Sequence, residues 1–321
     1  MDNSGSDSDS GSSSSSSSSA GGDAPVDFQS LEAEVASNPF DATHHVNLIK
    51  SLQSAGPSQY EQLAAARERM AASLALTPEL WLQWIEEEIA IAASQEDLAR
   101  VESLFERAAA DAPAPELYSA WTQFLEQRLD DGDCDVAAIA RVRAVHEQAL
   151  GSMGLNITAG GKLWDAAIAF ERQVSANAKV AATAAADAGT KIASLVKRRF
   201  ALPLEGMQAA ALALDTPLPP DAQPAYNVAL NLLAARMRHE TQVATATTEA
   251  WAAYAAWEGA QGDPSRAHVV HERSVQSLPY AETLWLGFSD FLCERKLYVS
   301  TSLKSPLALP ALCLDCFRSI D

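Results

Sequence analysis

Two short motifs alternate along the middle of this chain, and their alternation limits the possible folds more than any other feature. The first motif has three mainly aromatic residues at three-residue steps. Its copies begin at Trp81, Tyr118, Trp164, Trp251 and Trp285. The second motif starts with arginine and ends in a ring, a glutamate, an arginine or glutamine, and a small residue. Its copies begin at Arg100, Arg141 and Arg266. Steps of three and four residues share one helical face, so each motif predicts one amphipathic helix.

The spacing of the motifs predicts an array of helix pairs. The first aromatic residues lie 34 to 46 residues apart, except for an interval of 87 residues between Trp164 and Trp251. Such a period is typical of helix-pair solenoids of the tetratricopeptide type. One pair cannot cover its own apolar face, so the pairs must stack. The long interval predicts one degenerate pair between Ile192 and Thr245, with the run from Tyr226 to Leu233 in its second helix.

Composition divides the chain into three parts. Residues 1–27 are mostly serine, glycine and aspartate, which cannot bury apolar area, and we expect a disordered tail. Residues 28–298 are rich in helix formers, with proline and glycine mainly between the periodic stretches. They predict an all-α, right-handed superhelical solenoid of about six antiparallel helix pairs. Residues 299–321 lack helical periodicity, and we expect an irregular or disordered end, or the product of a truncated gene model.

The motif side chains are interpreted as the core of this array, because a stripe of aromatic residues at helical spacing is usually buried. The signature core comprises Trp81, Trp84, Phe105, Tyr118, Trp121, Phe124, Trp164, Phe170, Trp251, Tyr254, Trp257, Trp285, Phe288 and Phe291. The fixed order of the two motifs favours a solenoid over an irregular helical bundle.

Charge and motif content exclude several functional classes. Lysine and arginine number 23 and aspartate and glutamate 42, which gives a net charge of −19. This balance argues against nonspecific binding of nucleic-acid phosphates. The sequence has no glycine-rich phosphate loop, nucleophile elbow or His-Glu-x-x-His motif, so we expect neither an enzyme nor a cofactor. With no secretory signal and no run of roughly 18 apolar residues, we expect a soluble intracellular protein without a membrane span.

Two residue pairs resemble parts of metal sites. Cys313 and Cys316 form a single Cys-x-x-Cys pair, whereas a structural zinc site needs four ligands. His268 and His271 lie three residues apart on an expected helix, but His271 occupies the ring position of the second motif. We therefore expect no metal site.

Two charged runs are assigned to ordinary helix surfaces. Glu86, Glu87 and Glu88 are interpreted as a solvated helix face. The cluster 197–199 is lysine followed by two arginines, and we favour the end of a helix, where positive charge is stabilising, over a nuclear signal.

The two motifs together resemble the half-a-tetratricopeptide (HAT) repeat of RNA-processing proteins. A tryptophan, an aromatic residue three positions later and an aromatic-glutamate pair after that are followed by an arginine-led helix ending in Glu-Arg-Ala. Ordered segments from Leu31 to Lys296 also resemble the amino-terminal half of the HAT proteins that recycle U4 and U6 small nuclear RNAs. They include Asn38-Pro39-Phe40-Asp41, Leu76-Thr77-Pro78-Glu79-Leu80-Trp81 and Gly262-Asp263-Pro264-Ser265-Arg266.

This resemblance implies a protein-docking scaffold in pre-mRNA splicing, in the nucleus. The implied partners are proteins of the splicing small nuclear ribonucleoproteins and ubiquitin-specific proteases. With no segment resembling an RNA-recognition motif, we expect RNA contact only indirectly, and a monomer. Two alternatives stay open: a scaffold of mRNA 3′-end cleavage, and a tetratricopeptide-type chaperone adaptor. The motifs do not indicate which surface residues dock partners, because they consist of core positions.

Overall fold

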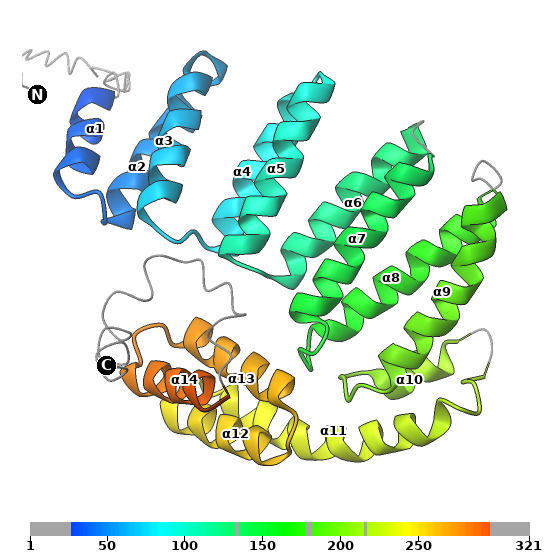
Figure 1. Ribbon diagram of the computed structural model, residues 1–321. Coiled ribbons are helices and arrows are strands. Elements are labelled where there is room, and N and C mark those ends of the chain that lie inside the picture. The colour runs from blue at the N-terminus through cyan, green and yellow to red at the C-terminus, as the bar shows by residue number, and fades with distance from the viewer. Residues whose placement is uncertain (1–26, 132–134, 178–181, 215–216, 296–321) are drawn as a thin grey trace, which may run out of the picture. The chain divides into compact units, whose positions relative to one another are not determined.

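The structure is a computed structural model that describes residues 27–131, 135–177, 182–214 and 217–295 (Figure 1). Within these ranges it has fourteen α-helices, one short 3-10 helix and no β-strand, which confirms the all-α prediction. The predicted tail (apart from Asp27), the end of the predicted array beyond residue 295 and the predicted irregular end lie outside the described residues. The chain forms two compact units, Met1–Leu74 and Ala75–Asp321.

The first unit contains three α-helices and the 3-10 helix. They are α1 (Phe28–Ser37), α2 (Ala42–Ser54), η1 (Pro57–Gln59) and α3 (Tyr60–Ser73). The carboxylates of Asp27 and Asp41 accept hydrogen bonds from backbone N–H groups at the starts of α1 and α2. Val35, Leu48 and Leu52 belong to the small apolar core of this unit. Unpaired N–H groups at helix starts explain why aspartate precedes both helices.

The second unit contains the motif-bearing helices. They are α4 (Pro78–Ile91), α5 (Gln95–Asp111), α6 (Pro115–Asp131), α7 (Val136–Met153), α8 (Gly160–Ala176), α9 (Ala182–Phe200), α10 (Met207–Leu212), α11 (Gln223–Val243), α12 (Thr248–Ala260), α13 (Pro264–Ser277) and α14 (Glu282–Arg295). The first motif lies on α4, α6, α8, α12 and α14, which we call first helices. The second motif lies on α5, α7 and α13, which with α9 we call second helices. Each first helix from α4 to α8, and α12, packs against the second helix that follows it, and neighbouring first helices also touch. This is the stacked arrangement of a helix-pair solenoid.

Helix boundaries follow the proline and capping signals of the sequence. Pro78 and Pro264 occupy the first positions of α4 and α13, where a missing N–H group costs no hydrogen bond. The preceding residues, Thr77 and Asp263, accept hydrogen bonds from backbone N–H groups of the first turn. Prolines at these places therefore begin helices as well as separating them.

The predicted degenerate pair is less complete than expected. Its first helix, α10, has six residues, whereas α11 has 21. The run from Tyr226 to Leu233 lies in α11 as predicted, but Val228 is 60% exposed. Gly206 precedes α10 with a left-handed backbone (φ 71°), so the helix cannot continue through it toward the N-terminus.

No helix in the described ranges is both long and apolar enough to cross a membrane.

Candidate docking surface

The signature side chains form the interior of the second unit. All are buried except Trp257 and Trp285, which are half-buried. The ring of each second motif packs against an aromatic residue of the next first helix. The centroid distances are 5.8 Å for Phe105 and Trp121, 5.4 Å for His146 and Phe170, and 5.5 Å for His271 and Phe288. These contacts link each pair to its successor, and they leave partner binding to other side chains.

Arginines on the second helices cover three of the four tryptophans that begin the first motif. Guanidinium carbons lie 5.4 Å from the Trp81 ring centroid (Arg107), 4.8 Å from Trp164 (Arg198) and 5.4 Å from Trp251 (Arg273). These distances are those of cation–π contacts. The sequence analysis missed these pairs, although the sequence contains a signal.

The signal is a correlated change between the two motifs. Where the first motif begins with Trp81 or Trp251, the second motif of the same pair has arginine two positions after its ring. Where it begins with Tyr118, that position is Gln148. An arginine is therefore present where the larger indole face is available.

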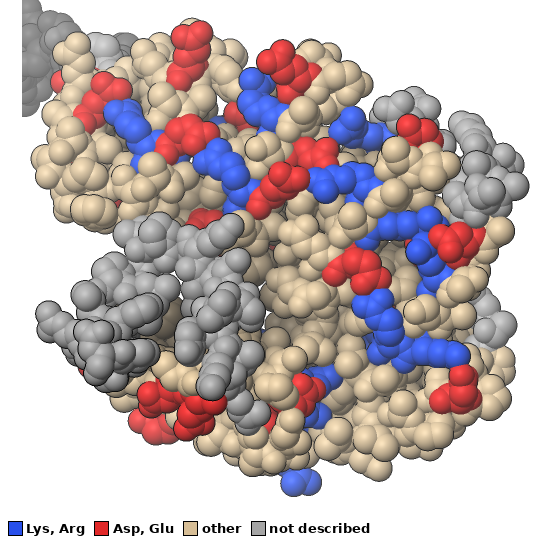
Figure 2. Space-filling view, viewed as in Figure 1, with Lys and Arg blue, Asp and Glu red and all other residues tan. Residues whose placement is uncertain are grey.

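The outward face of α5, α7 and α9 carries a band of alternating positive and negative side chains (Figure 2). Arg141 of α7 binds Glu102 and Glu106 of α5, the latter at 2.6 Å. Arg198 of α9 donates two hydrogen bonds, of 2.7 and 2.9 Å, to Glu147 of α7. These hydrogen bonds lower the pKa of Glu147. Because each of these cations faces a carboxylate, the band presents paired charge, which suits polar contacts with protein more than phosphate binding.

The basic cluster 197–199 ends α9, as favoured from the sequence. Lys197 pairs with Asp221 at 2.5 Å. Arg199 is buried, and its Nε lies 3.3 Å from Asp165. Together with Arg198, all three cations of the cluster are engaged by carboxylates of this chain.

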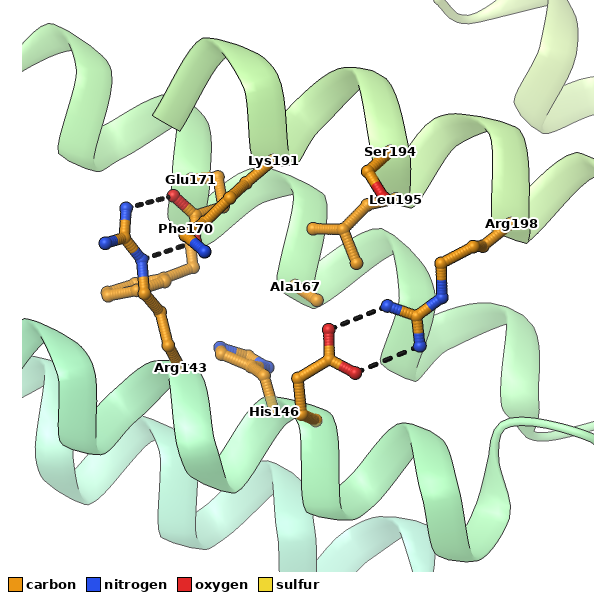
Figure 3. Close-up of a pocket in the computed structure, with 10 residues that line it drawn as sticks. Arg143, His146, Ala167, Phe170, Glu171, Lys191, Ser194, Leu195 and Arg198 are labelled. Atoms are coloured by element: carbon orange, nitrogen blue, oxygen red, sulfur yellow. Dashed lines mark hydrogen bonds and ion pairs between the residues drawn. The ribbon is translucent and has the colours of Figure 1, made fainter. Parts of the chain in front are cut away.

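A groove lies between α7 and α9, with α8 as its floor (Figure 3). We call it the α7–α9 groove. Ala167, Phe170 and Leu195 provide its apolar surface. Two ion pairs flank this surface: the pair of Glu147 and Arg198, and a pair in which Arg143 donates two 2.7 Å hydrogen bonds to Glu171. The volume is about 140 Å³, which suits a single apolar side chain.

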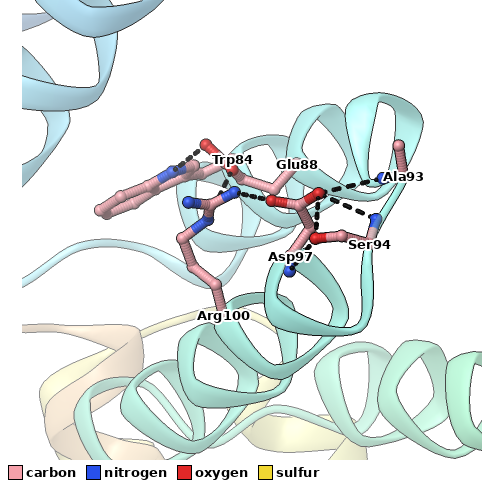
Figure 4. A network of polar contacts seen from close by, with 6 residues as sticks. All are labelled: Trp84, Glu88, Ala93, Ser94, Asp97 and Arg100. Carbon is pink, nitrogen blue, oxygen red and sulfur yellow. Dashed lines mark hydrogen bonds and ion pairs between the residues drawn. The ribbon is translucent and has the colours of Figure 1, made fainter.

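Glutamates that follow the first motif are buried rather than solvated. Glu88, Glu171 and Glu258 are 4%, 3% and 1% exposed. The interpretation of 86–88 as a solvated face is therefore wrong for Glu88, whereas Glu86 is exposed. Glu88 accepts a hydrogen bond from the Trp84 indole at 3.3 Å and lies 3.7 Å from Arg100 (Figure 4).

Buried carboxylates at this position depend on nearby hydrogen-bond donors. Glu171 has Arg143, and Glu258 has Arg236, whose Nε donates at 2.9 Å. A carboxylate is retained in an apolar interior only with such a partner. In Figure 4, Arg100 also binds Asp97, whose carboxylate accepts a hydrogen bond from the backbone of Ser94, the N-cap residue of α5. Arg100 therefore links the helix start to the buried Glu88.

Metal-binding geometry does not appear in the part of the chain that the structure describes. No group of three or more histidine, cysteine, aspartate or glutamate side chains there could hold an ion. The rings of His268 and His271 both pack on Phe288, at 5.3 and 5.5 Å. Cys313 and Cys316 lie outside the described residues.

Comparisons with known proteins identify similar sequences. Residues 29–186 match the family described as PRP39 N-terminal HAT repeat. Over 281 residues the chain is 31% identical to mouse (Mus musculus) and 30% identical to human (Homo sapiens) "Spliceosome associated factor 3, U4/U6 recycling protein". The zebrafish (Danio rerio) protein of that name is 27% identical over 295 residues. These matches cover 85% of this chain but 28% of the mouse and human proteins and 30% of the zebrafish protein, so the chain spans less than a third of these relatives.

Proposed function

Because this chain belongs to the HAT-repeat family, we propose that it is a non-enzymatic, protein-docking scaffold in pre-mRNA splicing, acting in the nucleus on U4/U6 small nuclear ribonucleoproteins. The name of its relatives supports the recycling step. Its partners are proteins of these particles, and ubiquitin-specific proteases by family resemblance. Contact with RNA is indirect, and the chain is a monomer.

The observation that carries this proposal is the separation of core from surface in the array. Motif aromatics are used for stacking, while the outward side of α7, α8 and α9 offers the α7–α9 groove. A helix or extended segment of a partner places one apolar side chain on Ala167 and Phe170. Its polar atoms meet the ion pairs at both ends of the groove. Solenoids bind proteins through extended surfaces of this kind.

The chaperone-adaptor alternative fits this groove less well. Such adaptors hold a peptide carboxylate with free cations. Here Arg143 and Arg198 already form two hydrogen bonds each, with Glu171 and Glu147. No feature of the groove specifically supports a scaffold of mRNA 3′-end cleavage.

Affinity capture from nuclear extract tests the proposal. The tagged chain is expected to retain U4/U6 particle proteins before and after ribonuclease treatment. Ser194 is exposed and lines the groove, so Ser194→Trp fills it and is expected to abolish capture. Ala193→Trp, at the exposed neighbouring position outside the groove, is the matched control. Recovery of cleavage factors or chaperones instead, or loss of all capture on ribonuclease treatment, would contradict the proposal.

A further inference from the structure

A second groove, of about 340 Å³, lies between the end of α7 and one face of α13. We call it the α7–α13 groove. Met153 and Val269 are among its apolar lining residues, and Gly151 lines its α7 side. A small cavity of about 10 Å³ shares Leu155, Val269 and Arg273 with the groove. Because they share these residues, the cavity and the groove lie next to each other.

The two buried glutamates beside this cavity are each bound by an arginine. Arg273 donates two 2.7 Å hydrogen bonds to Glu240, which also accepts from the Tyr254 hydroxyl at 3.0 Å. Burial raises the pKa of Tyr254, so its hydroxyl keeps the proton that it donates. Arg236 holds Glu258 with two hydrogen bonds. Arg273 and Arg236 thus each form two hydrogen bonds with one of the two buried carboxylates.

Arg266 is a third arginine in this cluster, and one of its nitrogen atoms lacks a hydrogen-bond partner in the described part of the chain. It lines the cavity and is 6% exposed. Its Nε lies 3.5 Å from Asp263, a half-exposed residue at the start of α13. Its Nη2 is buried and has no hydrogen-bond partner within the described residues. Burial, and then the charge of Arg236, lower the pKa of Arg266.

A buried donor without an acceptor is costly, because it has lost its water and gained nothing in return. A carboxylate oxygen that reaches the cavity from the groove would accept a hydrogen bond from Nη2 of Arg266. The cavity is large enough for about one atom of that size. The flanking apolar surface of Met153 and Val269 then contacts the residues next to the carboxylate.

We propose that the α7–α13 groove binds a segment of a partner protein that carries one aspartate or glutamate between apolar residues, and that its carboxylate is held by Arg266. Acidic side chains at the edge of the groove limit the partner segment to one acidic residue. Glu272 lines the groove, 3.5 Å from His268, and Asp263 is nearby, so a run of acidic residues is repelled. The groove is separate from the α7–α9 groove and does not depend on the splicing assignment.

Two glycines provide a matched pair of variants. A Cβ atom added at Gly151, at the exposed end of α7, would meet nothing within 4 Å, so Gly151→Leu fills the groove without disturbing the helix. A Cβ atom at Gly189 of α9 also meets nothing within 4 Å, and Gly189 lies outside the groove. Gly189→Leu is therefore the control. Arg266→Gln removes the charge and is expected to weaken peptide binding at least tenfold, with far-ultraviolet circular dichroism as the check that it folds like the wild type.

The test uses the full chain and a fluorescein-labelled, C-terminally amidated heptapeptide with one central glutamate flanked by leucines. Fluorescence anisotropy is expected to show at least tenfold weaker binding when glutamine replaces the glutamate, and at least tenfold weaker binding to Gly151→Leu. Gly189→Leu is expected to bind like the wild type. Equal binding of the two peptides, no saturable binding, or an unchanged Gly151→Leu would overturn the proposal. So would displacement of the peptide by a uridine hexanucleotide, which would assign the site to phosphate.

Discussion

The buried ion pair of Arg236 and Glu258 gives the sharpest test of how the array is held together. The two side chains are 3% and 1% exposed. Glu258→Gln keeps the side-chain shape but leaves a guanidinium charge in the interior without its carboxylate. Removing one partner of a buried pair costs about 3–5 kcal/mol of unfolding free energy. The pair of Arg198 and Glu147 also has two hydrogen bonds, but its side chains are 45% and 55% exposed. Glu147→Gln should therefore cost about 0–1 kcal/mol.

Equilibrium urea denaturation, followed by circular dichroism at the helical band, measures both costs. With an m value of about 3 kcal/mol per molar, Glu258→Gln lowers the urea midpoint by about 1 M or more, and Glu147→Gln by about 0.3 M or less. The double variant Arg236→Met with Glu258→Leu should recover most of the loss, because neither charge must then be desolvated. Equal midpoint shifts for Glu258→Gln and Glu147→Gln would refute this reasoning. So would a double variant that is no more stable than Glu258→Gln.

Three further predictions concern tight packing, pH and the signature core. In Gly160→Ala the new Cβ lies 2.7 Å from a backbone carbonyl oxygen at the end of α7, so the free energy of unfolding should fall by about 1–3 kcal/mol in thermal denaturation. Gly189→Ala should instead raise it by about 0.5–1 kcal/mol. Burial, and then a neighbouring histidine, lower the pKa of His271 from 6.5 to about 4. The unfolded chain therefore binds a proton first, stability falls as pH drops from 6.5 toward 4, and melting temperatures across this range should show that His271→Phe loses part of the slope. Trp121→Ala, at 1% exposure, should cost about 3–5 kcal/mol in urea denaturation, and Trp285→Ala less, because Trp285 is half-buried; equal costs would contradict the assignment of Trp121 to the interior.

The array was predictable because its strongest signal is local. Three-residue steps within each motif determine which face of a helix is buried, and proline at Pro78 and Pro264 marks where helices begin. The shortness of α10 was less accessible, because the spacing of motifs gives the length of chain between them and not how much of it is helical. The left-handed conformation of Gly206, which marks the start of α10, is seen only in the structure.

Contacts between helices were harder to predict from periodicity. Glu88 stands in an acidic run and was assigned to solvent, as charged runs usually are. Its burial depends on donors such as the Trp84 indole and Arg100, and their approach is set by packing in three dimensions. Both grooves have the same origin, since each is bounded by helices that do not follow one another directly in the sequence.

The matching of arginine to tryptophan has a consequence for anyone who rebuilds this protein. Placing α5 after α6 would set Arg107 opposite Tyr118, and placing α7 after α4 would give Trp81 only Gln148. The interchangeable cassette is therefore the complete hairpin, and engineered arrays should be lengthened or shortened by transplanting both of its helices together.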